Sequence, residues 1–221
     1  VKASKIFFQR HGRVSVRVGE PVRLSQFLDA LPKEWSEMNR DARKEALLAL
    51  GEELQFRIGE QATVLPSGLL ALGLLAHDKP KMSAEALERR IECFHAFLLR
   101  QGTIPLEEHV LNYGPLKEAM ARFVSTDKVE RVETDSGSVF EVEPNRRLTL
   151  EYYKNGIVHW FVPASLLATA IQAHGEDSFE PRYLTRDLRF LLFVLRYEFA
   201  LDPSLDVDTV ESLALEHLEA A

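Results

Sequence analysis

The sequence has almost no cysteine. Cys93 is the single cysteine among 221 residues, so the chain can form neither an intramolecular disulfide nor a cysteine-based zinc site. This usage is typical of a protein from a reducing compartment. Cys93 lies in a stretch of helical texture, which favours an ordinary helix position over a reactive thiol.

Long apolar runs are also missing. The longest apolar stretches are residues 64–76, 157–171 and 190–194. Pro66 interrupts the first stretch, and His159 and Pro163 interrupt the second, whereas a spanning helix needs about 20 apolar residues. We therefore expect no segment to cross a bilayer. No basic segment followed by an apolar core opens the sequence, so no signal peptide is expected, and the start at Val1 indicates a cut through a longer protein.

Positive charge is not in excess. The chain has 34 acidic and 27 basic residues, which gives a formal net charge of -7. Such a chain repels phosphate backbones and shows no basic cluster, so we expect no nucleic-acid partner. Hydrophobic residues make up 46% and charged residues 28%, the balance of a globular protein with a core.

One segment near the N-terminus has the sequence pattern of a strand. Residues 13–18 alternate polar and apolar side chains, which predicts a half-buried strand. Residues 19–21, which include Gly19 and Pro21, end it with a turn. Because no partner strand follows nearby, we expect its sheet to lie upstream of this chain.

Most of the remaining sequence has helical periodicity. In residues 39–58, apolar side chains recur at helical spacing, at Leu47, Leu50, Leu54 and Ile58. Shorter helices are expected at 67–77 and 114–126, and a further one is expected to be capped by Ser83 and closed by Gly102. A long helix is expected from Arg146, with an apolar stripe through Leu150–Ile171, and another at 185–201. Pro163 is expected to kink the long helix. Asp208 and Glu211 resemble a capping pair for a last helix to about Glu219.

A β-hairpin is expected near residues 128–143. Residues 128–134 and 138–143 are rich in strand-forming side chains and flank a short turn that contains Gly137. Two helices followed by a hairpin is also the order of a winged helix. Four glutamates in the hairpin favour a surface hairpin packed on helices over that alternative.

The sequence shows no active-site motif. Seven histidines are present, and none forms an i, i+4 pair with a neighbouring glutamate of the kind that binds zinc. There is no Gly-x-Ser-x-Gly elbow, no glycine-rich phosphate loop and no cysteine pair. His95 and His159 sit among apolar residues, where a satisfied core or interface histidine is expected.

Three stretches resemble one known family. Residues 16–22 (VRVGEPV), residues 61–72 (QATVLPSGLLAL) and residues 150–167 (LEYYKNGIVHWFVPASLL) are similar, in this order, to segments of bacterial glycerol-3-phosphate acyltransferases. The Tyr-Tyr-Lys-Asn segment at 152–155 is the most specific of these matches. The resemblance covers nearly the whole chain and weakens after about residue 175.

The resemblance implies both a fold and a function. Residues 1–21 would be the last strand and turn of an upstream α/β acyltransferase domain, and residues 22–221 a C-terminal helical domain, mainly α, with the small hairpin. The parent enzyme would transfer an acyl group from acyl-CoA or acyl carrier protein to glycerol 3-phosphate in phospholipid biosynthesis. It would contact the cytoplasmic face of the membrane peripherally, and this domain would brace its catalytic partner.

The family's catalytic signature is a histidine and an aspartate separated by four residues, with the histidine acting as general base. None of the seven histidines has an aspartate at that spacing, and the family's motifs for the glycerol phosphate are absent too. No catalytic, cofactor-binding or metal-binding residue is therefore expected in this chain, and no cofactor.

Three alternatives remain open at this point. A relative acting on dihydroxyacetone phosphate shares the implied architecture. Residues 83–143 could form a non-catalytic, winged-helix-like module for protein interaction, since the helix at 114–126 has only Lys117 and Arg122 as basic residues. The chain could also be a regulatory helical domain of another membrane-associated enzyme.

Overall fold

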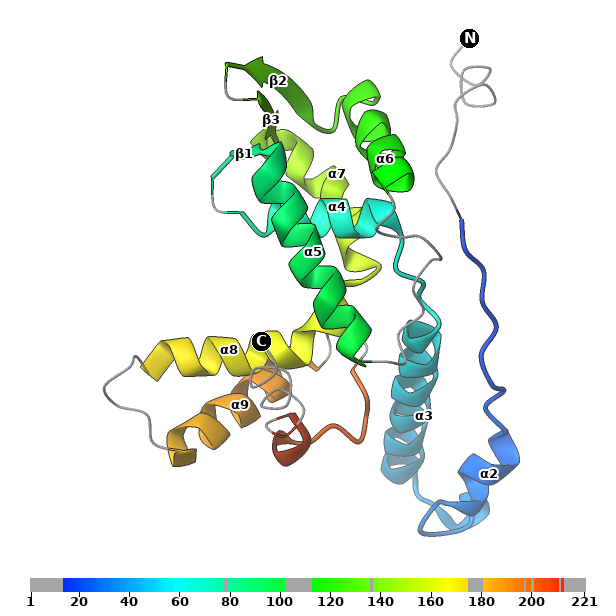
Figure 1. Ribbon diagram of the computed structural model, residues 1–221. Helices are drawn as coiled ribbons and strands as arrows, with labels where there is room; N and C mark the ends of the chain where they lie inside the picture. Colours follow the sequence, from blue (N-terminus) through cyan, green and yellow to red (C-terminus); the bar gives the residue numbers. More distant parts are fainter. Residues whose placement is uncertain are drawn as a thin grey trace. The chain divides into compact units, whose positions relative to one another are not determined.

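Helices make up most of the computed structural model, which describes residues 14–77, 79–101, 113–135, 137–174, 181–196, 198–199, 201–210 and 212 (Figure 1). A small three-stranded antiparallel sheet accompanies them, so the predicted mainly α fold is confirmed. The chain divides into two compact units. Unit 1 comprises Val1–Arg17 and Thr63–Ile157, and unit 2 comprises Val18–Ala62 and Val158–Ala221.

Unit 1 is built around one short apolar helix. Its elements are α4 (Pro66–Leu75), β1 (Lys81–Ser83), α5 (Ala84–Gln101), α6 (Tyr113–Ser125), β2 (Glu130–Thr134), β3 (Gly137–Glu141) and α7 (Pro144–Asn155). Helix α4 packs against α5, α6 and α7 (Figure 1), and all its residues from Gly68 to Leu75 are buried. A helix that is apolar all round needs cover on every side, so α4 forms the centre of unit 1.

Helix α5 begins where the sequence predicted. The Ser83 hydroxyl accepts a hydrogen bond of 3.2 Å from the backbone N–H of Ala86, as a helix cap does. Leu87, Ile91 and Leu98 are buried at helical spacing. The predicted closing residue, Gly102, lies outside the described residues.

The predicted hairpin is present and gains a third strand. Strands β2 and β3 pair antiparallel, and Gly137 after the turn has a φ of 116°, a conformation that favours glycine. Strand β1 pairs with the other edge of β3, so that Met82 lies opposite Phe140, and both are buried. The sequence analysis missed β1, because three residues are too short to show an alternating pattern.

The winged-helix-like alternative for residues 83–143 does not agree with the packing. Helices α5 and α6 share their core with α4, and α4 also packs against α7. Residues 83–143 therefore form one core with segments before and after them rather than a separate module.

The long helix expected from Arg146 is broken, but not at the predicted place. Helix α7 ends at Asn155, and a 3-10 turn, η2 (Val158–Phe161), leads into α8 (Val162–His174). Pro163 lies in the first turn of α8, where a missing N–H leaves no helical hydrogen bond unmade. The expected kink at Pro163 was thus wrong, and the chain passes from unit 1 to unit 2 at Gly156 and Ile157 instead.

Unit 2 joins N-terminal and C-terminal segments. Its elements are α2 (Leu24–Asp29), a 3-10 turn η1 (Trp35–Glu37), α3 (Arg40–Glu60), η2, α8 and α9 (Pro181–Leu195). A buried cluster joins α8, α9 and a short helical turn at 207–210; it consists of Val162, Leu166, Leu167, Ala170, Leu184, Leu188, Val207 and Val210. The helix predicted at 185–201 therefore exists, but it starts four residues earlier and ends at Leu195.

Helix α3 leaves its apolar stripe uncovered. The helix forms as predicted, and the Asn39 side chain caps its start by accepting from Ala42 N at 2.9 Å. Yet Leu47, Leu54 and Ile58 are 57%, 42% and 73% exposed, and Ala46 is the buried residue of the helix. The stripe thus predicts the helix correctly without being part of the core of this chain.

Residues 14–18 are extended but belong to no strand in the part of the chain described by the structure. Val14, Val16 and Val18 are 85%, 84% and 93% exposed. The predicted half-buried strand would need a sheet from outside this chain, so that strand stays a prediction.

The last helical turn has a different cap from the one predicted. Asp206 accepts hydrogen bonds from the N–H of Thr209 at 2.8 Å and from its hydroxyl at 2.6 Å. Asp208, the predicted cap, already lies inside the turn at 207–210, and Glu211 and Glu219 lie outside the described residues. The predicted pair was two residues late, because both Asp206 and Asp208 fit the capping pattern.

Candidate functional site

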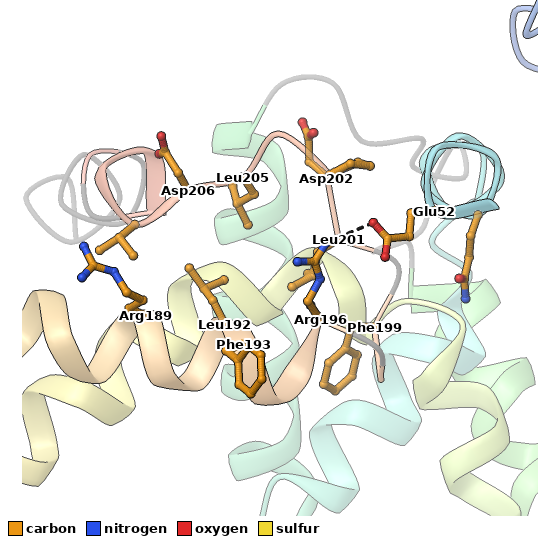
Figure 2. Close-up of a pocket in the computed structure, with 13 residues that line it drawn as sticks. Glu52, Arg189, Leu192, Phe193, Arg196, Phe199, Leu201, Asp202, Leu205 and Asp206 are labelled. Atoms are coloured by element: carbon orange, nitrogen blue, oxygen red, sulfur yellow. Dashed lines mark hydrogen bonds and ion pairs between the residues drawn. The ribbon is translucent and has the colours of Figure 1, made fainter. Parts of the chain in front are cut away.

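Unit 2 contains an open pocket of about 320 Å³ between α3, α9 and the loop that follows α9 (Figure 2). Its walls combine leucine and phenylalanine side chains with charged groups. The lining residues are Glu52, Gln55, Arg189, Leu192, Phe193, Arg196, Phe199, Leu201, Asp202, Pro203, Leu205, Asp206 and Val207.

Four charged groups of the pocket, on Glu52, Arg196, Asp202 and Asp206, make hydrogen bonds with one another or with nearby residues. Arg196 Nη2 donates to Glu52 Oε2 at 3.0 Å and so ties α3 to the end of α9 (Figure 2). Asp202 accepts from the N–H of Ser204 at 2.8 Å and from its hydroxyl at 2.6 Å. Asp206 caps the turn at 207–210, and its hydrogen bonds with Thr209 hold the pKa of its carboxyl below the ordinary value.

The pocket residues have the chemistry of binding and packing. The lining residues named above include no histidine, cysteine or serine, and their carboxylates, those of Glu52, Asp202 and Asp206, all accept the hydrogen bonds described above. This pocket carries no sequence motif, because its parts come from segments 144 residues apart in the chain.

The described histidines behave as structural residues. His159 Nε2 donates to the Gly59 carbonyl oxygen at 3.2 Å, and its ring lies 4.6 Å from that of Trp160. Burial lowers the pKa of His159, and the Gly59 bond opposes this shift in part. Burial also lowers the pKa of His95. His159 matches the expected satisfied histidine, whereas the same expectation for the partly buried His95 stays a prediction. His11, His109 and His217 lie outside the described residues.

No group of three or more histidine, cysteine, aspartate or glutamate side chains among the described residues is placed to hold a metal ion. The expectation that the chain holds no catalytic, cofactor-binding or metal-binding residue remains a prediction.

Two of the stretches that resemble a known family, 61–72 and 150–167, contact each other in unit 1. A Cβ on Gly68, in the first stretch, would lie 3.2 Å from Ile157 Cγ2, in the second. The Tyr153 ring packs on Phe123 of α6, with 5.1 Å between ring centroids. Arg147, just before the second stretch, donates to the Leu75 carbonyl oxygen at the end of α4 at 3.2 Å. These stretches therefore specify how α4 and α7 pack.

In the part of the chain that the structure describes, the fold is a mainly helical region of two compact units, with an open pocket in unit 2. The chain belongs to the family described as the glycerol-3-phosphate acyltransferase C-terminal region, whose model matches residues 1–221.

Curated relatives agree with this membership. The chain is 29% identical over 218 residues to the glycerol-3-phosphate acyltransferase of Pseudomonas syringae pv. tomato and 27% identical to that of Pseudomonas fluorescens (strain SBW25). Each match covers 96% of this chain and 24% of the relative. A Shewanella amazonensis relative of the same name is 27% identical over 76% of this chain. The chain thus spans about a quarter of the length of the curated relatives it matches.

Among the described residues, no single helix has both the length and the apolar composition to cross a membrane. Two consecutive segments separated by a sharp bend, Pro144–Asn155 and Val158–Ala173, meet the criteria of length and composition only when they are taken together.

Proposed function

We propose that this chain is the C-terminal part of an enzyme that acylates the 1-hydroxyl of glycerol 3-phosphate, the first step toward a phospholipid. The family match over residues 1–221 carries this proposal, and the printed names of the relatives favour glycerol 3-phosphate over dihydroxyacetone phosphate as the acceptor. In the reaction, the hydroxyl oxygen attacks the carbonyl carbon of an acyl thioester of coenzyme A or acyl carrier protein. A C–O ester bond forms, the C–S bond breaks, and the thiol leaves with the proton.

The role of the chain within that enzyme is to brace an upstream catalytic domain. Val14, Val16 and Val18 alternate along an extended, exposed segment, the form that a strand takes when its sheet is elsewhere. Exposed strands of this kind pair with a sheet edge when one is available. The remaining three quarters of the relatives' length supplies a candidate for that sheet.

Helix α3 offers a second contact surface for the same domain. Leu47, Gly51, Leu54 and Ile58 follow the four-and-three spacing of a single helix face. A Cβ on Gly51 would meet no atom within 4 Å, so this part of the face is open. Burying such a stripe stabilises an interface by roughly 25 cal/mol per Å² of apolar surface. We call these four residues the α3 stripe.

The parent enzyme would work at the cytoplasmic face of the membrane, in peripheral contact with it. Its acyl donor and its acylated product both carry long apolar chains, so a location at the lipid surface fits the chemistry.

The bracing role is tested in a full-length parent protein that carries this chain at its C-terminus. Acylation of glycerol 3-phosphate is measured with a water-soluble, short-chain acyl-CoA and no vesicles. We expect the double variant Leu54→Lys/Ile58→Lys to lose most of the activity, because two charges would enter a buried interface. The matched control is Leu148→Lys/Tyr152→Lys, at two other exposed positions, which are 81% and 80% exposed.

Retention of full activity by the α3 variant, or an equal loss in the control, would contradict the bracing role. A full-length parent that acylates no glycerol 3-phosphate would contradict the proposed reaction itself.

A further inference from the structure

Helix α9 has two sharply different faces. Leu184 and Leu188 are 2% and 0% exposed and lie in the core of unit 2. On the outside, Phe190, Phe193 and Val194 are 64%, 70% and 47% exposed. Two exposed phenylalanines and a valine on one helix face form an apolar patch, and such patches mark interaction surfaces.

The same outer face carries positive charge. Arg182, Arg186 and Arg189 are exposed and are spaced by four and three residues, so they lie along one side of α9. The Arg182 and Arg186 guanidinium groups lie 4.8 Å and 5.4 Å from the centre of the Tyr183 ring. Asp187 is the single acid of this helix, and it pairs with Arg186 at 2.9 Å. Helix α9 thus has a net charge of about +2 in a chain whose net charge is -7.

The acidic side chains of the neighbouring pocket lie elsewhere. Figure 2 shows Phe193 projecting from α9 on the side opposite to Asp202 and Asp206. Arg189 and Phe193 both line the pocket, and Figure 2 shows the Arg189 side chain on the same side of α9 as Asp206. The phenylalanines are therefore preceded along the helix by Arg182 and Arg186, and the carboxylates of Asp202 and Asp206 lie on the side of α9 opposite to Phe193. Aromatic and arginine side chains on one face are what an amphipathic helix presents to a lipid interface.

We propose that the outer face of α9, defined by Arg182, Arg186, Arg189, Phe190, Phe193 and Val194, docks on the surface of an anionic phospholipid bilayer. Phe190 and Phe193 would enter the boundary between headgroups and acyl chains, and the arginines would bind lipid phosphates. This surface rests on the proposed function for its role, because an enzyme that makes a phospholipid precursor delivers an acylated product to a bilayer.

Phenylalanines beside arginines distinguish this face from the other exposed apolar surfaces. The α3 stripe has exposed Arg40 and Lys44 on the same side at its start but contains only leucine, isoleucine and glycine, with no aromatic side chain. Leu148 and Tyr152 on α7 lie on a helix face shared with Asn145 and Asn155 and bordered by Glu151, which pairs with Lys154, so this face carries no arginine. A protein partner fits those faces equally well, whereas the arginine pattern of α9 fits a surface of dense negative charge.

The test is co-sedimentation of the 221-residue chain with vesicles of pure phosphatidylcholine and with vesicles that also contain phosphatidylglycerol. We expect binding to the anionic vesicles that weakens with salt. The variant Phe190→Ser/Phe193→Ser is expected to lose at least about tenfold in affinity. The variant Arg182→Gln/Arg186→Gln is expected to lose roughly 25-fold, from about fivefold for each arginine.

The matched control is Leu148→Ser/Tyr152→Ser, which removes an equally exposed apolar pair from a face without arginine and is expected to bind within about twofold of the original chain. Circular dichroism of all variants verifies that they are folded. The substituted positions are exposed, although Arg182 donates to the Tyr183 hydroxyl at 3.2 Å, Arg186 pairs with Asp187, and the Tyr152 ring lies 5.5 Å from that of Tyr153.

Three results would overturn the proposal: no binding to anionic vesicles, equal binding to both vesicle types, or binding that the α9 variants keep or the control loses. If a second copy of the chain or another protein covers α9, vesicle binding is absent and the α9 face is wrongly assigned. The acyl-transfer assay without vesicles is independent of this result, so the two proposals can fail separately.

Discussion

At the scale of single residues, Gly68 lies in close contact with Ile157, which joins two of the stretches that resemble the family. The Cβ that Gly68 lacks would lie 3.2 Å and 3.3 Å from Ile157 carbons and 3.4 Å from the Tyr153 carbonyl oxygen. Tyr153 lies in the last turn of α7, Ile157 lies between α7 and η2, and Ile157 is 2% exposed. A side chain at position 68 would therefore push α4 away from α7.

The variant Gly68→Val is expected to lose roughly 1–3 kcal/mol of unfolding free energy, because overpacking strains a dense core. The control is Gly51→Val, since nothing lies within 4 Å of a Cβ at Gly51. Urea unfolding followed by circular dichroism compares the two. Equal stability of both variants would show that α4 and α7 can separate without cost.

His159 makes the stability of unit 2 depend on pH. Burial lowers its pKa from the ordinary value of 6.5, while the hydrogen bond to the Gly59 carbonyl opposes this shift in part. Below pH 6.5 the unfolded chain binds the proton more readily than the folded chain does, so stability falls as the pH drops from about 7 to 5. Partly buried His95 acts in the same direction.

The variant His159→Gln is expected to flatten this dependence, because glutamine keeps an N–H donor for Gly59 and does not titrate. Urea midpoints at pH 7.5, 6.5 and 5.5 measure the slope. An unchanged slope in the variant would mean that His159 is protonated within the fold, and His95→Gln serves as the comparison at the partly buried second histidine.

At the scale of elements, the short turn at 207–210 depends on one cap. Asp206 satisfies the N–H and the hydroxyl of Thr209, and the turn places Val207 and Val210 in the core of unit 2. Because the pKa of Asp206 is lowered in the fold, this stabilisation is present above the ordinary value of 3.8 and is lost as the pH falls through the folded pKa.

Asp206→Ala is expected to speed amide hydrogen exchange at Thr209 and Val210, since the alanine accepts no hydrogen bond. Asp206→Asn keeps an acceptor oxygen and should retain most of the protection. Asp208→Ala tests the cap that the sequence favoured, and we expect little change there. The assignment fails if Asp208→Ala opens the turn and Asp206→Ala does not.

Elements with strong local signals could be predicted from the sequence, and those fixed by distant partners could not. Ser83 and the turn before Gly137 act on their own neighbours, so α5 and the hairpin were found close to their observed positions. Strand β1 exists because Met82 meets Phe140 from 58 residues further along the chain, which no local pattern records. Pro163 misled the prediction, because proline suits the first turn of a helix as well as a break.

The pocket in unit 2 depends even more on contacts between distant parts of the sequence. Arg196 and Glu52 carry no motif, and only the fold of unit 2 brings them together. By contrast, the spacing of Arg182, Arg186 and Arg189 is visible in the sequence. The conclusion that these arginines lie on the exposed face of α9 depends on the burial of Leu184 and Leu188 on the other face, which only the structure shows.

At the scale of the whole molecule, the chain is expected to be inactive as an acyltransferase by itself. The sequence contains no histidine followed by an aspartate at the family's spacing, so it lacks the general base. The purified chain is mixed with glycerol 3-phosphate and a long-chain acyl thioester, and product is compared with a sample without protein. Turnover above that background, abolished by substituting one of its histidines, would refute the expectation.

During synthesis, the two parts of unit 2 are made at different times, because most of unit 1 lies between them in the sequence. Helix α3 leaves the ribosome well before α8 and α9, and the roughly 95 residues of Thr63–Ile157 take about 5–20 s to follow at usual rates. Glu52 then waits for Arg196, 144 residues later. A stop codon just before α9 would therefore deprive an N-terminal helix of its partners, although every residue of that helix had already been made.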